Sequence, residues 1–326
     1  MKRLHKQLGI SLVEVLVSLV ISLFLLAGIV QVYTGNKTAF RFTNALAEIQ
    51  ENGRFALDTM TQDLRLAGEW GCVEFDPADT NNFNNTIPGV MPGYDSDFHD
   101  FVGEEAIEGT DGATDTIIVR GGRPGQANVE SPFETAGSND LMITNSGNFD
   151  TNDIVLVARC GANDLLIAAE ADILRVVSNT NQSATKNKLQ LAGNKSQQFE
   201  KDAMVIELQT VTYSIGVDPV SGQPTLFRQE FNGIVEELVE GVEDMQILYG
   251  IDSDNDQFPN QYVTSDNVPD FNAVVALRVM LLIHSIDDFV TEAPQAYTFN
   301  GVPTTPADRR LRQVFTTTIA LRNRIG

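Results

Sequence analysis

The sequence predicts an α+β fold, in which one long N-terminal helix packs on a β-rich domain. An apolar run reaches Val30 and continues into an amphipathic helical pattern that ends near Gly68. Beyond this glycine, short β-like runs alternate with turn residues, and no helical pattern of comparable length returns. Helix and strands are thus segregated along the chain, as is typical of the α+β class.

The N-terminal segment divides into a basic leader, residues 1–9, and an apolar run, residues 10–32. The leader contains Lys2, Arg3 and Lys6 and no acid, so this end is expected to stay in the cytoplasm. The apolar run is long enough to cross a bilayer. We therefore expect the rest of the chain to be exported and held by one transmembrane helix.

One acid, Glu14, interrupts this apolar run. A charged side chain in a membrane costs about 2.5–3.5 kcal/mol or more, so it should have a partner. A simple anchor helix leaves Glu14 unexplained, and an ordinary signal peptide would need a small-x-small cleavage site after the run. Cleavage after Gly9 would instead give Ile10 a free amine, and that amine on a neighbouring subunit could neutralise Glu14.

The helix is expected to continue to about residue 68, so the helical segment is 10–68 and would be roughly 85 Å long. Its second half is amphipathic, and Gly68 is a natural stop. The apolar residues that recur at three- and four-residue spacing are Phe42, Ala45, Leu46, Ile49, Gly53, Ala56, Met60, Leu64 and Ala67. This face should pack on the β-rich domain, residues 69–326.

The β-rich domain begins with a long region, residues 74–113, that is rich in Asn, Asp, Gly and Pro and predicts surface loops. Short β-like runs follow. They are Thr116–Arg120, Leu141–Thr144, Ile154–Cys160, Leu165–Ala168, Ile173–Ser178, Met204–Gln209, Val211–Val217, Thr225–Glu230, Gly241–Tyr249, Ala273–His284 and Gln313–Leu321. In one of them, Val211, Tyr213, Ile215 and Val217 alternate and should share a face.

Charge and cysteine content narrow the possible partners and metal sites of the protein. With 22 Lys and Arg against 44 Asp and Glu, the net charge is −22, which argues against nucleic acid as a partner. The two cysteines, Cys72 and Cys160, lack zinc-ligand spacing. In an exported domain they are expected to form a disulfide; the alternative is two buried free thiols.

Residues 6–14, with Gly9 before Ile10 and Glu14 five residues into the mature chain, resemble the prepilin processing site of type IV pilins and type II secretion pseudopilins. In that family a prepilin peptidase cuts after the glycine and N-methylates the new first residue. The family usually has Phe at that position, where this chain has Ile10. The resemblance implies that Gly9 and Ile10 are the processing site and that Glu14 serves assembly.

Three further stretches, 52–72, 241–256 and 308–324, together resemble the PilW-type minor pilins of type IV pili. The resemblance implies a type IV pilin-like fold and a minor subunit that forms a priming or tip complex with other minor pilins and the major pilin. It implies an inner-membrane assembly platform, a periplasmic domain before assembly, and a place at the tip or in the fibre afterwards. The alternatives are a J-type pseudopilin of type II secretion and a tip adhesin.

Asp252, Asp254 and Asp256 alternate as in the first half of a calcium loop. Gln257 and Val263 stand where an EF-hand has Gly and Glu, so the motif is not an EF-hand. Two interpretations remain open: a calcium loop completed by other residues, and a solvated acidic turn. Calcium is the one cofactor for which the sequence offers a candidate site.

The arginines at 309, 310, 312, 322 and 324 form a basic cluster in an acidic chain. Arg309, Arg310 and Arg312 could contact an acidic partner. They could instead pair within the chain, with candidate acids Glu236, Glu237, Glu240, Glu243 and Asp244.

No enzymatic motif is apparent. The histidines, His5, His99 and His284, are isolated, and the chain has no nucleophile elbow and no glycine-rich phosphate loop. The sequence therefore predicts an assembly protein and not an enzyme.

Overall fold

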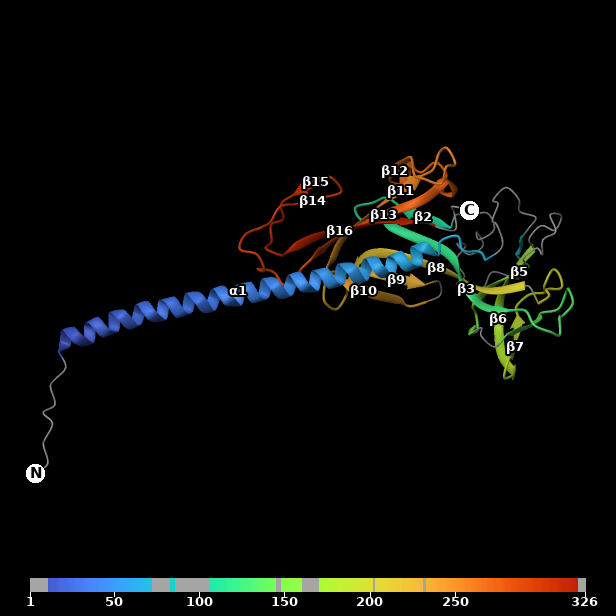
Figure 1. Cartoon of the computed structure of the whole chain (residues 1–326), viewed down its shortest axis with the longest axis horizontal. Coiled ribbons are helices and arrows are strands. Elements are labelled where there is room, and N and C mark those ends of the chain that lie inside the picture. The colour runs from blue at the N-terminus through green and yellow to red at the C-terminus, as the bar shows by residue number, and fades with distance from the viewer. Residues whose placement is uncertain are drawn as a thin grey trace, which may run out of the picture.

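The computed structural model describes residues 11–71, 83–85, 106–144, 148–159, 170–201, 203–230 and 233–321. A single long helix, α1 (Leu12–Arg65), projects from a β-rich body, and its N-terminal end lies far from that body (Figure 1). This arrangement confirms the predicted α+β class. At 1.5 Å per residue, α1 is about 81 Å long.

The helix has one buried stripe in its C-terminal part. The stripe consists of Ala45, Ile49, Gly53, Ala56, Met60 and Leu64, at spacings of three or four residues, and Ala67 is buried just beyond the last turn. Each of these residues belongs to the predicted apolar face. The helix ends at Arg65, three residues before the predicted stop at Gly68, which adopts φ +72°, a left-handed conformation that glycine tolerates best.

The strands fall into two sheets and a short hairpin. Their bounds are β1 (Phe83–Asn85), β2 (Ile107–Thr110), β3 (Thr116–Asn128), β4 (Asp140–Thr144), β5 (Ile154–Arg159), β6 (Glu170–Ser183), β7 (Lys186–Leu191), β8 (Ala203–Val217), β9 (Pro224–Glu230), β10 (Val235–Glu240), β11 (Val242–Ile251), β12 (Gln261–Val263), β13 (Val274–His284), β14 (Tyr297–Phe299), β15 (Val302–Thr304) and β16 (Arg312–Ala320). Two short 3₁₀ turns, Ser265–Asn267 and Phe271–Ala273, lie between β12 and β13.

The larger sheet is organised around the long strand β8. Strand β3 pairs along one side of β8, while β5 and then β9 pair along the other side. The path through this sheet runs β10-β9-β8-β5-β6-β7-β4, and β1 joins β6 as a parallel neighbour. The smaller sheet has the antiparallel order β12-β11-β13-β16, and α1 contacts β16 and β13.

The buried apolar residues form two separate cores. The first, here called the body core, joins the helix stripe to β2, the first half of β3, the second half of β8, and strands β9 to β11, β13 and β16. The second, here called the insert core, contains only residues between Ala127 and Val205. Strands β3 and β8 each begin in one core and end in the other, and so they connect the two.

Most predicted strands are present, but several observed strands, among them β7 and β10, were not predicted. The loop region predicted for 74–113 ends early, because Ile107–Thr110 forms β2 against β3, with Ala106 and Ile107 buried. Strand β2 is only four residues long and contains Glu108 and Gly109, which are disfavoured in strands, so its sequence gave little sign of a strand. The runs Met204–Gln209 and Val211–Val217 are one strand, β8, whose last residue, Val217, is 70% exposed. The predicted run Leu165–Ala168 lies outside the described residues.

Candidate functional site: the exposed helix and its anchorage in the body

The N-terminal half of α1 presents an apolar surface with no cover. Every described residue from 11 to 44 is exposed, including Leu12, Phe24 and Tyr33. By length and composition this half can cross a membrane. Because a soluble monomer rarely exposes so continuous an apolar surface, this half is built to lie in lipid or among other helices.

Glu14 lies in the first turn of this exposed half. It is the only acid between residues 11 and 47, and its side chain is exposed. A carboxylate in the first turn of a helix is stabilised by the helix dipole, which offsets part of its cost in an apolar environment. The processing residues Gly9 and Ile10 lie outside the described residues, so the pairing of Glu14 with an amine stays a prediction.

The buried stripe seats α1 closely on the smaller sheet. A Cβ atom placed on Gly53 would lie 2.5 Å from the ring of Phe315, which belongs to β16. Only glycine fits this contact without movement of the ring, because carbon atoms of neighbouring groups normally stay about 3.5–4.0 Å apart. Gly53 therefore sets the distance between the helix and β16.

A polar clasp near the C-terminal end of α1 fixes the helix to the larger sheet. Asp63 accepts hydrogen bonds from the Tyr213 hydroxyl at 2.5 Å and from Arg228 Nε at 2.8 Å. Burial raises the pKa of Tyr213, and the neighbouring Asp63 carboxylate raises it further. Burial lowers the pKa of Arg228, but the hydrogen bonds to Asp63 and Glu230 outweigh this and keep it above its ordinary value. The clasp therefore joins the Asp63–Arg228 ion pair to a neutral tyrosine.

The sequence analysis missed this clasp. Asp63 directly precedes Leu64, at the border of the buried stripe, and this was the one local signal that it would face the body. Its partners are 150 and 165 residues away, so no spacing rule could have identified them.

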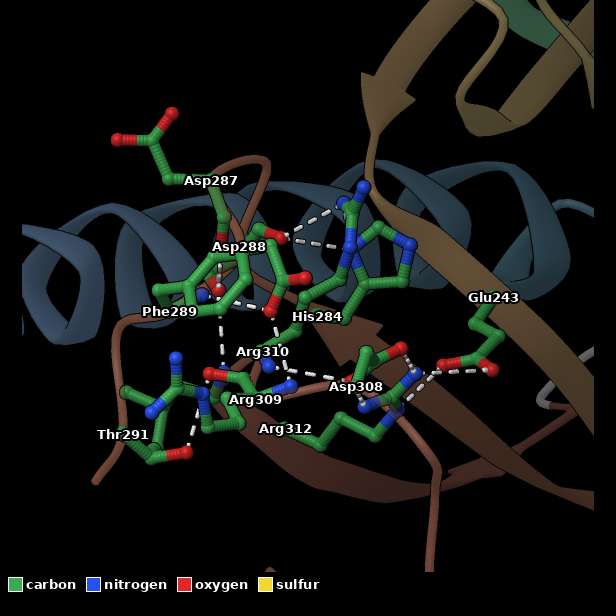
Figure 2. A network of polar contacts seen from close by, with 12 residues as sticks. Glu243, His284, Asp287, Asp288, Phe289, Thr291, Asp308, Arg309, Arg310 and Arg312 are labelled. Carbon is green, nitrogen blue, oxygen red and sulfur yellow. Dashed lines mark hydrogen bonds and ion pairs between the residues drawn. The ribbon is translucent and has the colours of Figure 1, made fainter. Parts of the chain in front are cut away.

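A second polar network lies where α1 leaves the body (Figure 2). Arg41, on the helix, donates to the Asp288 carbonyl at 3.3 Å and lies 3.7 Å from the Asp287 carboxylate. The backbone N–H of Arg309 donates to the Asp288 carboxylate at 2.9 Å, and the Arg309 guanidinium lies over the Phe289 ring. The loop after β13 thus connects the helix to the segment that leads into β16.

Two of the three arginines predicted to contact a partner are engaged within this network. Arg312 bonds Glu243 at 2.7 Å and Asp308 at 2.6 Å, and its side chain is only 6% exposed, which contradicts a role in partner contact. Arg310 Nη1 donates to the carbonyls of Ser285 and Ile286 and to the Gln223 side chain.

The internal interpretation therefore holds for Arg310 and Arg312, although Glu243 is the only predicted acid that pairs with them among the described residues. The hydrogen bond from Arg312 lowers the pKa of Asp308 to about 2. Arg309 is half-buried and its partner contact stays a prediction, while Arg322 and Arg324 lie outside the described residues.

The acidic loop after β11 brings together the three predicted calcium ligands. One carboxylate oxygen each from Asp252, Asp254 and Asp256 lies within 4.8 Å of the others. Oxygens that bind one calcium ion at 2.3–2.6 Å can be up to about 5 Å apart, so the three residues fit such an ion. Calcium needs six to eight oxygens, and these three residues alone do not supply them.

Asp252 also has a structural role without any ion. Its carboxylate accepts hydrogen bonds from four successive backbone N–H groups, those of residues 254–257, at 2.8–3.3 Å. Burial raises its pKa, but these hydrogen bonds outweigh burial and lower it. The loop is thus stabilised as an acidic turn, and calcium binding stays a prediction that calorimetry on the chain and its Asp254→Ala variant would test.

The disulfide expected between the two cysteines stays a prediction. Cys72 and Cys160 both lie outside the described residues. The residues before them are Gly71, after the end of α1, and Arg159, the last residue of β5.

Comparison with known proteins gives two family matches. The family described as type IV pilus-assembly protein W matches residues 212–323, and the prokaryotic N-terminal methylation motif matches residues 4–30. No curated protein and no solved structure matches the chain. The first match begins within β8 and runs through the end of β16. It covers the body-core strands β9 to β11, β13 and β16, and it leaves out β2, β3 and the insert core.

Proposed function

We propose that this chain, a type IV pilin-like protein of the PilW type, is a minor pilin that joins other pilins in a priming or tip complex of the pilus. Both family matches support this proposal, since one covers the methylation motif and the other the body strands from β9 to β16. The match to PilW favours the pilus over the related type II secretion system.

The division of α1 is the observation that carries the proposal. Residues 12–44 are exposed, and the first part of them, 12–33, is apolar except for Glu14 and a few uncharged polar residues, while the stripe from Ala45 to Leu64 is fixed in the body core. A subunit built in this way can stay in the inner membrane with its body in the periplasm. It can then transfer the same apolar surface from lipid to a bundle of pilin helices, because both environments accept uncharged helices.

Processing and Glu14 complete the mechanism. Prepilin peptidase would cut between Gly9 and Ile10 and leave a methylated amine. Glu14 would pair with such an amine on a neighbouring pilin, and this ion pair would offset the cost of burying a carboxylate among apolar helices. The pair would also set the axial position of one subunit against the next.

The test compares Glu14→Ala with Glu48→Ala, an exposed acid on the same helix. We expect both variants to insert in the membrane and to be processed at Gly9, and only Glu14→Ala to be depleted from sheared pili and from complexes with other minor pilins. Mass spectrometry of the mature N-terminus checks processing. Normal incorporation of Glu14→Ala would contradict the pairing mechanism.

A second role, as an adhesin, is supported by the insert core. Residues 127–205 form a core of their own outside the matched range, and Asn128 and Met204 face each other across β3 and β8. Residues 129–203 can therefore be replaced by an Asn-Gly turn that closes β3 onto β8. Normal piliation with lost surface adhesion would support the adhesin role, and unchanged adhesion would exclude it.

A further inference from the structure

The two cores meet at a gap beside β8. Strand β5 begins at Ile154, opposite Leu208, and β9 ends at Glu230, opposite Val211. Between these pairs, Gln209 and Thr210 have no strand partner on this side of β8 within the described part of the chain. The turn before β5 and the end of β9 face each other across this gap.

The gap is a cavity of about 270 Å³. Its walls are the turn Thr151–Asn152–Asp153, the stretch from Glu207 to Thr210 on β8, and Glu230. Ligand pockets usually measure about 300–1,000 Å³, so the cavity suits a small molecule and is much larger than a single metal ion requires. Thr210 is only 9% exposed, and its hydroxyl has no hydrogen-bond partner in the described structure.

The charges around the cavity are unbalanced. Arg123 holds the wall together: its Nε donates to Gln209 at 2.8 Å, and its Nη atoms lie 3.5 Å from Glu230 and 3.9 Å from Glu207. Asp153 has no ion pair with any described residue. Burial raises the pKa of Asp153, and the nearby Glu207 raises it further.

The negative charges still exceed the positive ones when the charged residues of the adjoining clasp are counted. Asp63, Asp153, Glu207 and Glu230 supply four negative charges, whereas Arg123 and Arg228 supply two positive charges, and this leaves an excess of two negative charges. The cavity is therefore complementary to a cation.

We propose that this cavity binds a small organic cation with a primary ammonium group, held between Asp153 and Glu207. An ammonium carries three N–H donors, and the wall offers carboxylate, amide and hydroxyl oxygens to accept them. Charge-assisted hydrogen bonds of this kind are stronger than neutral ones. The site lies between the two cores, so an occupant would contact the insert through Asp153 and the body through Glu230.

Isothermal titration of the full chain in detergent micelles with n-butylammonium chloride tests the proposal, at constant chloride concentration. Saturable binding is expected for n-butylammonium and not for n-butanol, which has a similar shape without the charge. Glu207→Gln and Asp153→Asn should each weaken binding about tenfold or more, because each removes a charged acceptor. Asp256→Asn, an exposed acid in the loop after β11, is the matched control and should bind normally.

Three outcomes would overturn the proposal. They are the absence of saturable binding, equal binding by the wild type and both cavity variants, and displacement of n-butylammonium by calcium at equal ionic strength, which would make this a metal site. Melting curves show whether a variant is folded. If Glu207→Gln does not fold, Asp153→Asn decides, because an Asn side chain can still accept the hydrogen bond from the Asp150 N–H.

Discussion

The body core and the insert core are built from the chain in opposite ways. The body core gathers residues from Ala45 to Leu321, whereas the insert core uses only the stretch from Ala127 to Val205. The family match at residues 212–323 lies on the body side. The difference teaches that the part of the body from β9 to β16 is what matches the family model, while the insert is a nearly self-contained addition between β3 and β8.

The two cores are expected to form at different stages of folding. Contacts between residues far apart in sequence form slowly, because a long loop must first be closed. The clasp between α1 and β8 closes a loop of 150 residues, whereas β6 and β7 are joined by a short hairpin. We therefore expect the insert to form its contacts before the body does.

The largest effect is expected from the predicted disulfide, which would connect the two regions. In the sequence, Cys72 comes directly after Gly71, beyond the helix end, and Cys160 comes directly after Arg159, the last residue of β5. Closing a loop of about 90 residues would add roughly 4–5 kcal/mol to the free energy of unfolding in the chain-entropy model. Urea unfolding with and without reductant measures this difference. Two reactive thiols in the unreduced protein would show that the cysteines are free.

Single core residues test whether the two regions are independent. Leu64, in the body core, and Leu174, in the insert core, are fully buried, and each substitution to Ala should cost about 2–5 kcal/mol. Hydrogen exchange should rise in α1 and the smaller sheet for Leu64→Ala, and in β5 to β7 for Leu174→Ala. Leu26→Ala, on the exposed helix, is the control for both. Equal loss of protection in α1 for both core variants would mean that the regions unfold as one.

The clasp should have the next largest effect. Asp63→Asn removes the charge that pairs with Arg228 and should lower the free energy of unfolding by about 2–3 kcal/mol. Asp58→Asn, an exposed acid on the same helix, should change stability little. Chemical denaturation of the two variants gives the comparison. Equal stability of both would show that the buried stripe alone seats the helix.

The smallest effect is expected from titration at the helix exit. Asp308 has a pKa of about 2 in the folded chain because of its hydrogen bond with Arg312, against an ordinary value of 3.8. The ionised form therefore stabilises the fold above pH 3.8, and this contribution is lost as the pH falls toward 2. Since Asp308 is one third exposed, we expect about 1 kcal/mol at neutral pH.

Asp308→Asn should remove this dependence on pH. Asp153→Asn should change the pH dependence of stability in the opposite direction. Burial raises the pKa of Asp153, so its ionisation destabilises the fold, and the Asn variant lacks this loss of stability as the pH rises. Thermal melts across the acidic range measure both variants. An unchanged melting profile for Asp308→Asn would mean that solvent screens the pair with Arg312.

The local features of the fold were predictable from the sequence. The helix stripe follows from periodicity, and the structure has it. The helix ends at Arg65, three residues before the glycine at which the sequence predicted its stop. Strands with a strong apolar pattern, such as β5 and β13, were also found. Short strands such as β2 were missed because their side chains carry little pattern and a neighbouring strand stabilises them.

At the candidate sites too, groupings of residues close in sequence were predictable, and contacts between distant residues were not. The three acids of the loop after β11 lie together as predicted, because they are close in sequence. Arg312 turns inward to Glu243 and Asp308, although the sequence left an external partner open. The cavity beside β8 had no signal in the sequence, since it arises from where two strands end.

By itself the sequence determined the parts whose physics is local: the processing motif, the apolar half of the helix with its single acid Glu14, and the amphipathic half that follows. Each of these features depends on residues that lie within a few helical turns of one another. Only the tertiary structure decided which distant groups meet, such as Asp63 with Tyr213 and Arg228, and that the strands divide into two cores. Such contacts depend on the packing of the whole chain, and no local pattern of residues specifies them.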